Sequence, residues 1–450
     1  MATDTAIEIS QSKTASAALT ERTDWSSLWK REDWWAVWVG ALILLLGVAR
    51  WLPAVPQIAK WTTIAGAFPA GTGTAGSVAL LFVFLLVLTL VAAAVTGTNI
   101  RRYVAGFSVV FGLAFLATWV GKYASFTNWG LETVLWALAL GLIVSNVWRV
   151  PDWLKTAART EFFIKIGLVL LGAEILFSTI VKGGIVGMGQ AIVVVLAVWF
   201  FAYWAGRKFG LGKEFSSVMA SGVSICGVSA AIAAGGAIKG NPKHVSHVIS
   251  LVLLVAMPML VGMPFLAKAM GLPPAMAGAW MGGTIDTTGA VVAAGTLVDP
   301  QTGLQAAALV KMAQNVLIGF AAFFLAIWAA FSLEKKPDAS RPRAIEIWYR
   351  FPKFILGFVI ASVAFSLLVE PNLGADATKA VIGITGGYRG WFFALAFVAI
   401  GLETRIKDLV AVGQGRPAAA FLTAQAANIV WTLLIVWLLW SGIFFASPIK

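Results

Sequence analysis

Two glycine-rich stretches decide the fold of this chain: GVSICGVSAAIAAGG at residues 222–236 and GGTIDTTGAVVAAG at residues 282–295. They overlay when one is shifted by 60 residues, which places Cys226 opposite Asp286. Glycine lowers helix propensity, and Ser and Thr hydroxyls compete for backbone hydrogen bonds. We therefore predict a break in the helix of each stretch, with the two breaks facing each other. The alternative is that the small residues only allow close helix packing.

The composition is that of a membrane protein. Of 450 residues, 60% are hydrophobic and 12% are charged, and uncharged runs such as 61–100 and 417–449 exceed the length of a membrane span. A positive-inside topology explains the formal net charge of +13 without nucleic acid as a partner. One cysteine excludes an intrachain disulfide, and two histidines leave little material for a metal site, so we expect neither metal nor cofactor.

Apolar runs predict an all-α polytopic membrane protein with about 11–13 transmembrane segments. The thirteen segments lie at 34–52, 74–96, 103–121, 128–148, 162–180, 185–206, 216–237, 244–267, 276–298, 303–331, 351–369, 389–404 and 420–446, and the broken pair is 216–237 and 276–298. The chain then divides into a cytoplasmic tail (1–33), N-terminal spans (34–127), a first transporter half with both broken segments (128–332), a cytoplasmic linker (333–349) and C-terminal spans (350–450).

The distribution of Lys and Arg predicts the orientation. The amino-terminal tail and every second loop carry 22 of these residues, the opposite side carries 9, and Lys165 and Lys311 lie inside segments. This bias places the amino terminus in the cytoplasm and the carboxyl terminus in the periplasm. If both broken segments re-enter the membrane without crossing it, the split is 23 against 8, so charge leaves spanning and re-entry open.

A second pair of similar sequence segments predicts an inverted repeat. LGAE at residues 171–174 is followed by Gly184, and IGLE at residues 400–403 is followed by Gly413 at the same offset. The second copy lies in the seventh segment after the first, so the copies run antiparallel if each segment crosses the membrane.

Charged residues inside membrane segments are costly and mark candidate functional sites. Asp286 and Lys311 lie at similar depth on consecutive segments, so we expect them to pair. Gln314 and Asn315 extend the polar face of Lys311 with groups suited to an oxyanion. Glu174 is the remaining deep charge, whereas Lys165 and Glu403 are expected to have structural roles near segment ends.

Small polar residues complete the predicted substrate and ion site. They bracket the two breaks, where half-helix amino termini favour anions and free carbonyls favour Na⁺. With the charged and amide residues above, the members of the site are Ser224, Cys226, Ser229, Thr284, Asp286, Thr287, Thr288, Lys311, Gln314, Asn315 and Glu174. For Cys226, a role as a small packing residue is favoured over redox chemistry.

Several blocks of this sequence resemble a known family. KIGLVLLGAEILF at 165–177, SGVSICGVSAAIAA at 221–234, GTIDTTGAVVAAG at 283–295, KMAQN at 311–315 and AFVAIGLET at 396–404 are similar to blocks of the YeiH-like family of proposed sulfate exporters in the bacterial inner membrane. The resemblance covers about 129–440 and implies a fold related to cation:proton antiporters and bile-acid symporters, with an elevator-type mechanism. Many members carry arginine where this chain has Gln314, and Arg is the usual bidentate clamp for an oxyanion.

These features favour a secondary active transporter of a small anion, such as sulfate, a sulfonate or a related oxyanion, coupled to H⁺ or Na⁺. A transporter of a small carboxylate and an anion channel remain alternatives. A membrane enzyme is disfavoured because no nucleophile with a base is evident. The lipid bilayer and a second copy of the chain, in a homodimer, are the other partners considered.

The charge bias gives a testable topology. A reporter that is active only in the periplasm should be inactive when fused after residue 33 and active when fused after residue 443, since the bias places these sites on opposite sides. A cytoplasm-specific reporter at both positions is the control. The same compartment at both positions would show that the number of crossings is even.

Overall fold

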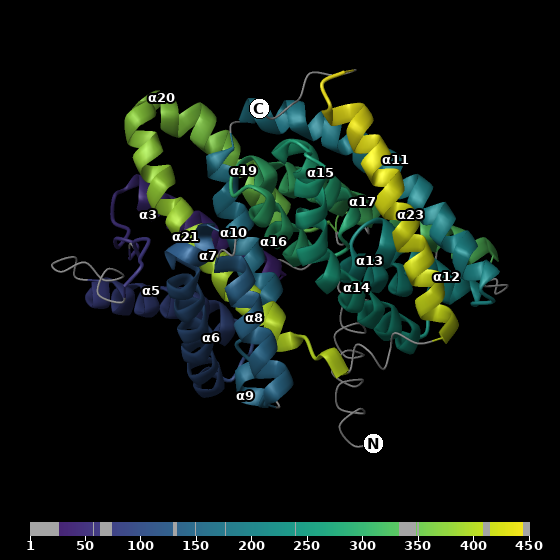
Figure 1. The fold of residues 1–450 in the computed structure, drawn as a ribbon, viewed down its shortest axis with the longest axis horizontal. Helices are drawn as coiled ribbons and strands as arrows, with labels where there is room; N and C mark the ends of the chain where they lie inside the picture. The colour runs from purple at the N-terminus through teal and green to yellow at the C-terminus, as the bar shows by residue number, and fades with distance from the viewer. Residues whose placement is uncertain are drawn as a thin grey trace. The chain divides into compact units, whose positions relative to one another are not determined.

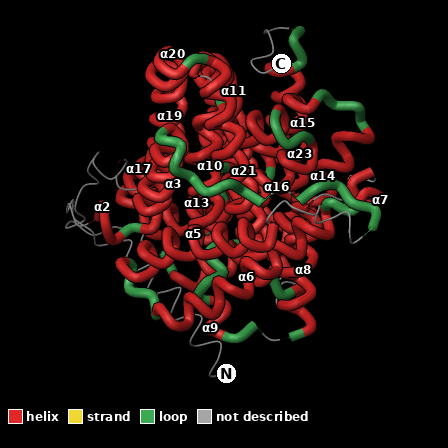
Figure 2. The backbone as a smooth tube through the Cα atoms, turned by 90° about the vertical axis from the view of Figure 1, so that its left-hand side faces the viewer, coloured by secondary structure: helices red, strands yellow, loops and turns green. Residues whose placement is uncertain are grey.

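The computed structural model describes residues 27–56, 58–63, 74–128, 133–148, 150–175, 177–238, 240–332, 348, 351–407 and 415–443. Over these residues the chain forms helices joined by short loops, without β-strands (Figures 1 and 2). The predicted all-α architecture is therefore confirmed. Nearly all of the tail predicted at 1–33, and all of the linker predicted at 333–349 except residue 348, lie outside the described residues.

The helices have these bounds in chain order: α2 (Ser27–Lys30), α3 (Glu32–Val48), α5 (Thr74–Val95), α6 (Ile100–Gly121), α7 (Ala124–Asn128), α8 (Thr133–Val147), α9 (Asp152–Lys155), α10 (Thr160–Glu174), α11 (Phe177–Lys208), α12 (Lys213–Ser224), α13 (Gly227–Ala237), α14 (Pro242–Ala269), α15 (Pro274–Thr284), α16 (Thr288–Val298), α17 (Thr302–Ser332), α19 (Phe354–Ala364), α20 (Glu370–Leu373), α21 (Ala375–Glu403) and α23 (Gly415–Trp440). A π-helical turn, Phe365–Val369, joins α19 to α20.

Eight helical stretches of the described residues are long and apolar enough to cross a membrane. They comprise α5, α6, α11, α14, α17, the α19–α20 stretch, α21 and α23. Three further predicted segments correspond to the shorter helices α3, α8 and α10, of 17, 15 and 15 residues. The protein is thus a multi-pass membrane protein, as the hydropathy predicts.

Several predicted segment ends differ from the observed helix ends, and two of these differences involve the same partly buried ion pair. The segment expected at 162–180 ends as helix α10 at Glu174, and the segment expected at 389–404 begins as helix α21 at Ala375. Lys379 and Arg389 interrupt the uncharged run that marks a span in the sequence. Arg389 is accommodated inside α21 because its Nε lies 2.8 Å from Glu174 Oε1.

The chain folds into two compact units, which are described separately. One consists of the described parts of 25–181 and 353–405, and we call it the α10–α21 unit. The other consists of the described parts of 182–352 and 406–450, and we call it the hairpin unit because it contains both glycine-rich stretches. Residues close in sequence, such as Pro352 and Lys353, therefore belong to different units.

The α10–α21 unit is built around an antiparallel helix pair. Thr160 Oγ1 at the start of α10 donates to Glu403 Oε2 at the end of α21, at 3.0 Å. Glu174 at the end of α10 meets Arg389 in α21. Glu174 and Glu403 are 229 residues apart, and so are Thr160 and Arg389. The 229-residue shift that relates LGAE to IGLE therefore also relates one contact to the other. This equivalence of the two contacts confirms the predicted inverted repeat.

Serines of two neighbouring helices bond to equivalent carbonyls. Ser145 Oγ of α8 donates to the Thr404 carbonyl oxygen at 2.7 Å, and Ser362 Oγ of α19 donates to the Ile175 carbonyl oxygen. Thr404 and Ile175 each directly follow one of the related glutamates. A serine hydroxyl therefore satisfies a carbonyl that the end of each helix leaves free.

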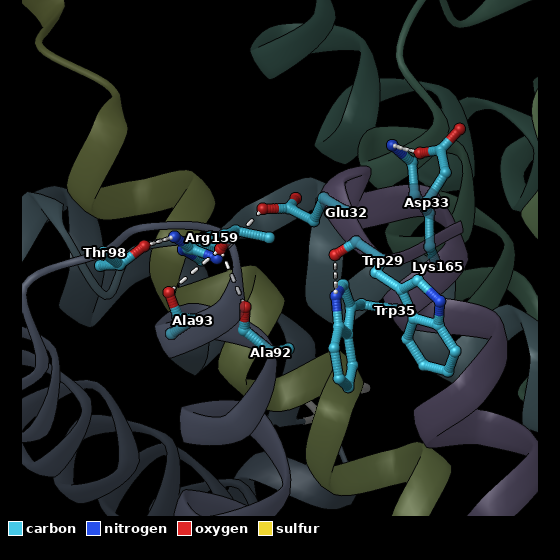
Figure 3. Close-up of polar contacts among 10 residues, drawn as sticks. Trp29, Glu32, Asp33, Trp35, Ala92, Ala93, Thr98, Arg159 and Lys165 are labelled. Atoms are coloured by element: carbon cyan, nitrogen blue, oxygen red, sulfur yellow. Dashed lines mark hydrogen bonds and ion pairs between the residues drawn. The ribbon is translucent and has the colours of Figure 1, made fainter. Parts of the chain in front are cut away.

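An ion-pair cluster fixes the start of α3 against α10 (Figure 3). Lys165 Nζ donates to Asp33 Oδ1 at 2.8 Å and lies 3.6 Å from Glu161 Oε2. Arg159 Nη1 lies 3.3 Å from Glu32 Oε2. Lys165 therefore has the structural role that its position near a segment end predicts, and Asp33 is the partner that the sequence did not reveal.

The related glycines in the helix pair should be intolerant of side chains. A Cβ at Gly172 would overlap the Phe358 carbonyl oxygen, and one at Gly401 would overlap the Leu138 carbonyl oxygen, whereas one at Gly184 meets nothing within 4 Å. We expect Gly172→Ala and Gly401→Ala each to reduce stability by about 1–3 kcal/mol because backbone atoms must move apart. Thermal unfolding in detergent, with Gly184→Ala as control, measures this. Equal melting temperatures for all three variants would contradict the packing described.

Candidate functional site

The first glycine-rich stretch forms a helical hairpin. Helix α12 ends at Ser224, Ile225 and Cys226 form a turn, and α13 begins at Gly227. Glu214 near the start of α12 accepts a hydrogen bond from the backbone N–H of Asn241, which lies between α13 and α14, and its Oε1 lies 2.9 Å from His244 Nδ1. Both open ends of the hairpin therefore lie together. The predicted segment 216–237 re-enters and does not span.

The second stretch forms a similar hairpin. Helix α15 ends at Thr284, residues 285–287 form the turn, and α16 begins at Thr288. Cβ positions at Gly278 of α15 and Gly295 of α16 would both contact Gly303 at the start of α17. The open ends of this hairpin are thus adjacent as well, and the predicted segment 276–298 also re-enters. The breaks predicted near Ser224–Gly227 and Thr284–Thr288 are confirmed.

The two turns meet. The Gly227 backbone N–H donates to the Asp286 carbonyl oxygen at 2.7 Å, and Cys226 Sγ lies 4.0 Å from Thr288 Oγ1. Helix α14 connects the two hairpins and has 28 residues, about 42 Å at 1.5 Å per residue. The first hairpin precedes α14 and the second follows it, so their open ends lie at opposite ends of this long helix while their turns touch. Helices α13 and α16 both pack against α14 and α17 (Figure 1).

Side-chain amides from two other helices satisfy the carbonyls at the turns. Gln314 Nε2 of α17 donates to the Gly283 carbonyl oxygen at 2.9 Å and to that of Ser224 at 3.4 Å. Asn428 Nδ2 of α23 donates to the Val223 carbonyl oxygen at 3.2 Å and to that of Thr284 at 3.3 Å. The shift of 60 residues between the two stretches exchanges these two sets of acceptors. Gln314 and Asn428 are therefore equivalent partners of the two hairpins.

Lys311 is buried and bonded to neutral groups. Its Nζ donates to the Ile225 carbonyl oxygen at 2.9 Å and to Gln314 Oε1 at 2.8 Å, and the residue is 2% exposed. The carboxyl end of α12 carries a partial negative charge, which attracts the ammonium. The direct ion pair expected between Lys311 and Asp286 is therefore not formed, although the two charges are near enough to attract each other. The carbonyl at the first turn takes the place that the sequence assigns to the carboxylate.

Asp286 is buried without a hydrogen-bond partner on either carboxylate oxygen among the described residues, and it is 1% exposed. Other side-chain oxygens beside the turns share this property: Ser224 Oγ, Thr284 Oγ1, Asn315 Oδ1 and Gln425 Oε1. Buried polar groups in proteins are nearly always hydrogen-bonded, so an unpartnered set at one place marks a binding site for water, an ion or a substrate.

The other predicted site residues have different positions. Thr287 caps α16 by accepting from the Ala290 N–H at 3.3 Å, and Thr288 Oγ1 accepts from Asn315 Nδ2 at 3.4 Å. Ser229 is exposed on α13. Glu174 belongs to the α10–α21 unit, where Arg389 compensates its charge. Ten of the eleven residues thus belong to the hairpin unit.

Sequence reasoning missed a second set of polar partners. Gln425 Nε2 donates to the Thr284 carbonyl oxygen at 2.8 Å, and Gln190 Nε2 of α11 donates to that of Ala279 at 2.9 Å. Thr432 Oγ1 donates to Asn428 Oδ1 at 2.8 Å. The signal was present, since residues 425, 428 and 432 lie on one face of an otherwise apolar helix.

The described residues contain no group of three or more His, Cys, Asp and Glu side chains that could hold a metal ion. The site consists of one carboxylate, one ammonium, hydroxyls and amides. Two apposed re-entrant hairpins, held by polar side chains of long apolar helices, thus define a multi-pass membrane protein with a polar centre in its interior.

Comparison with known proteins gives the family. Residues 105–419 match the model of the family described as Conserved hypothetical protein 698, and the chain belongs to this family, the YeiH-like one that the sequence blocks resemble. A UPF0324 membrane protein of Rhodopirellula baltica is 41% identical over 399 residues, which cover 87% of this chain and 73% of the relative.

A UPF0324 membrane protein of Nitratidesulfovibrio vulgaris is 38% identical over 357 residues, which cover 77% of this chain and 61% of the relative. One of Nitrosomonas europaea is 31% identical, with 73% of this chain and 76% of the relative covered. The chain thus matches about three fifths of the length of the N. vulgaris relative. No solved structure matches the chain.

The amide partners of the turns should be needed for stability. Asn428→Leu should lower the free energy of unfolding by about 1–3 kcal/mol, because the Val223 carbonyl loses its amide donor in an apolar interior. Thr423→Val on the same helix is the control, since that exposed hydroxyl only bonds back to the Ala419 carbonyl oxygen. Melting temperatures in detergent provide the comparison. An unchanged Asn428→Leu variant would mean that this carbonyl has another donor.

Proposed function

We propose that the protein is a secondary active transporter that moves a small anion, such as sulfate, a sulfonate or a related oxyanion, across the bacterial inner membrane. We propose that this transport is coupled to an H⁺ or Na⁺ gradient. The observation that carries this proposal is the meeting of two re-entrant hairpin turns beside the Lys311 ammonium. Irregular backbone in a membrane protein is tolerated where it is buried in protein or lines a polar cavity, and in transporters it forms the substrate site.

The electrostatics of the turns suit an anion. Helices α13 and α16 both begin at the turns, so their amino-terminal N–H groups and partial positive charges gather there. Lys311 contributes a full positive charge, and the hydroxyls of Ser224 and Thr284 have no hydrogen-bond partner among the described residues. N–H groups, an ammonium and hydroxyls are the donors that an oxyanion requires.

A carrier accounts for the arrangement better than a channel does. The hairpins enter from opposite ends of α14, so each closes the route from one side, whereas a channel needs a continuous polar pathway. The division of the chain into two compact units is compatible with an elevator mechanism, in which the hairpin unit would carry the anion. We propose this mechanism on that basis and on family resemblance.

A small carboxylate is the second candidate substrate, and one observation favours it. Lys311 is the single cationic side chain bonded at the turns among the described residues. Gln314, which stands where many relatives carry arginine, directs its amide to backbone carbonyls. One cation matches a monovalent carboxylate or sulfonate better than divalent sulfate.

Counterflow in proteoliposomes tests the proposal. Vesicles loaded with unlabelled anion should transiently accumulate the labelled anion, for sulfate, isethionate or acetate, because a carrier exchanges bound substrate while a channel does not. Lys311→Met should reduce the accumulation about 100-fold or more, since a charged group that binds an anion contributes roughly 2–4 kcal/mol. Lys268→Met, which removes an exposed lysine at the end of α14, is the control and should transport normally.

Two results would contradict the proposal. Equilibration of the label without transient accumulation would show a channel. Accumulation that is equal in the Lys311→Met and Lys268→Met variants would show that the anion binds elsewhere.

A further inference from the structure

The unpartnered side-chain atoms beside the turns are all oxygens. Six side-chain oxygens have no hydrogen-bond partner among the described residues: both oxygens of Asp286, the hydroxyls of Ser224 and Thr284, and the amide oxygens of Asn315 and Gln425. All five residues are at most 2% exposed. Four of the six atoms can only accept, when Asp286 is ionised. The set therefore lacks a directly bonded donor or cation among the described residues.

These oxygens are gathered by the contacts of their own residues. Asp286 lies in the second turn and is joined to the first turn through its carbonyl oxygen and the Gly227 N–H. Asn315 bonds Thr288, two residues after Asp286, and Gln425 bonds the carbonyl of Thr284, two residues before it. Ser224 is the last residue of α12, directly before the first turn. Both turns, α17 and α23 thus contribute.

Lys311 attracts Asp286 electrostatically but does not bond directly to any of these oxygens. Its Nζ is directed to the Ile225 carbonyl oxygen and to Gln314 Oε1, and no ion pair with Asp286 is formed. The other titratable group facing the turns is the Cys226 thiol, near Thr288. His244 and His247 of α14 contact Phe215 at the open end of the first hairpin, away from the turns. A buried carboxylate without compensation is costly.

The chemistry of the set distinguishes among cations. Carboxylate, hydroxyl and amide oxygens are hard ligands, which suit Na⁺, Mg²⁺ or Ca²⁺ and not thiophilic metals. One carboxylate beside the Lys311 ammonium gives too little negative charge for a divalent ion. The backbone carbonyls that hold Na⁺ in many broken-helix sites already accept from Gln314, Asn428 and Lys311. Side chains must therefore provide most of the ligands.

We propose that the hairpin turns bind one Na⁺ through Asp286, Ser224, Thr284, Asn315 and Gln425, and that this ion and the anion bind cooperatively. Na⁺ neutralises Asp286 and leaves the positive charge of Lys311 available to the anion. By reciprocity, the anion raises the affinity for Na⁺ by the same factor. The coupling half of this inference rests on the proposed function and makes the transporter a sodium–anion symporter. The sodium site itself does not depend on it.

Thermal unfolding without any anion substrate tests the sodium site. At constant ionic strength, NaCl should raise the melting temperature of the purified protein above its value in choline chloride or KCl, since a ligand stabilises the state that binds it. Asp286→Asn should raise the half-saturating Na⁺ concentration by about tenfold or more, as the loss of a charged ligand does. Asp299→Asn is the matched control, because Asp299 caps the start of α17 and lies outside the turns.

A second variant covers the case that Asp286→Asn does not fold. Thr284→Val removes a hydroxyl that bonds to none of the described residues, so the fold should persist while the affinity for Na⁺ falls. A melting temperature of the unaltered protein that responds equally to Na⁺, K⁺ and choline overturns the sodium site. A Na⁺ response that is equal in Asp286→Asn and Asp299→Asn places the ion elsewhere and also overturns it.

Measurements of anion binding distinguish the proposed sodium coupling from the proposed transport of an anion. The apparent affinity for sulfate, isethionate or acetate should increase with Na⁺ in the unaltered protein and lose that dependence in Asp286→Asn. Anion binding that depends on pH and not on Na⁺ would identify a proton on Asp286 and overturn sodium coupling while the transporter proposal stands. A sodium response with no binding or counterflow of any anion would refute the transporter proposal and leave the sodium site supported.

Discussion

Pairing of the main-chain polar groups at the two hairpin turns is the constraint on which the hairpin unit depends. Each turn ends one helix and begins another inside an apolar segment, and carbonyls freed there cannot turn to lipid. Gln314 and Asn428 each donate to both hairpins, and Lys311 donates to the first turn. The same hydrogen bonds that satisfy the backbone thus hold the two hairpins together and fix the site.

In the α10–α21 unit, carbonyls freed at helix ends are also hydrogen-bonded by side chains. Ser145 and Ser362 donate to the carbonyls that directly follow Glu403 and Glu174. In both units, the two copies of an internal sequence repeat make equivalent contacts. In a repeat of this kind, the same packing arrangement occurs in both copies. A mutation in one copy is therefore best compared with the equivalent mutation in the other copy.

Charges inside the protein fall into two classes. Arg389 and Lys165 each have a carboxylate partner, Glu174 and Asp33, and hold helices together. Within the described part of the chain, Asp286 has no such partner, and Lys311 bonds only to neutral oxygens. A protein that only needed to fold would gain by pairing or removing these two charges. The absence of a direct salt bridge between these two described residues is what motivates the proposal that the hairpin turns bind ions.

The sequence by itself determined the helical class, most of the membrane segments, the positions of both breaks and the two pairs of similar segments, because these depend on local composition and on repeats. Most of the site residues named from the sequence, including Asp286 and Lys311, lie at or beside the turns. The tertiary structure decided that both broken segments double back, because re-entry depends on which helix ends come together, as Glu214 and Asn241 do. It also decided the partners of each charge. Hydrogen bonds between α23 and the turns join residues up to 205 positions apart, so no local pattern could assign Asn428 to the Val223 carbonyl or Lys311 to that of Ile225.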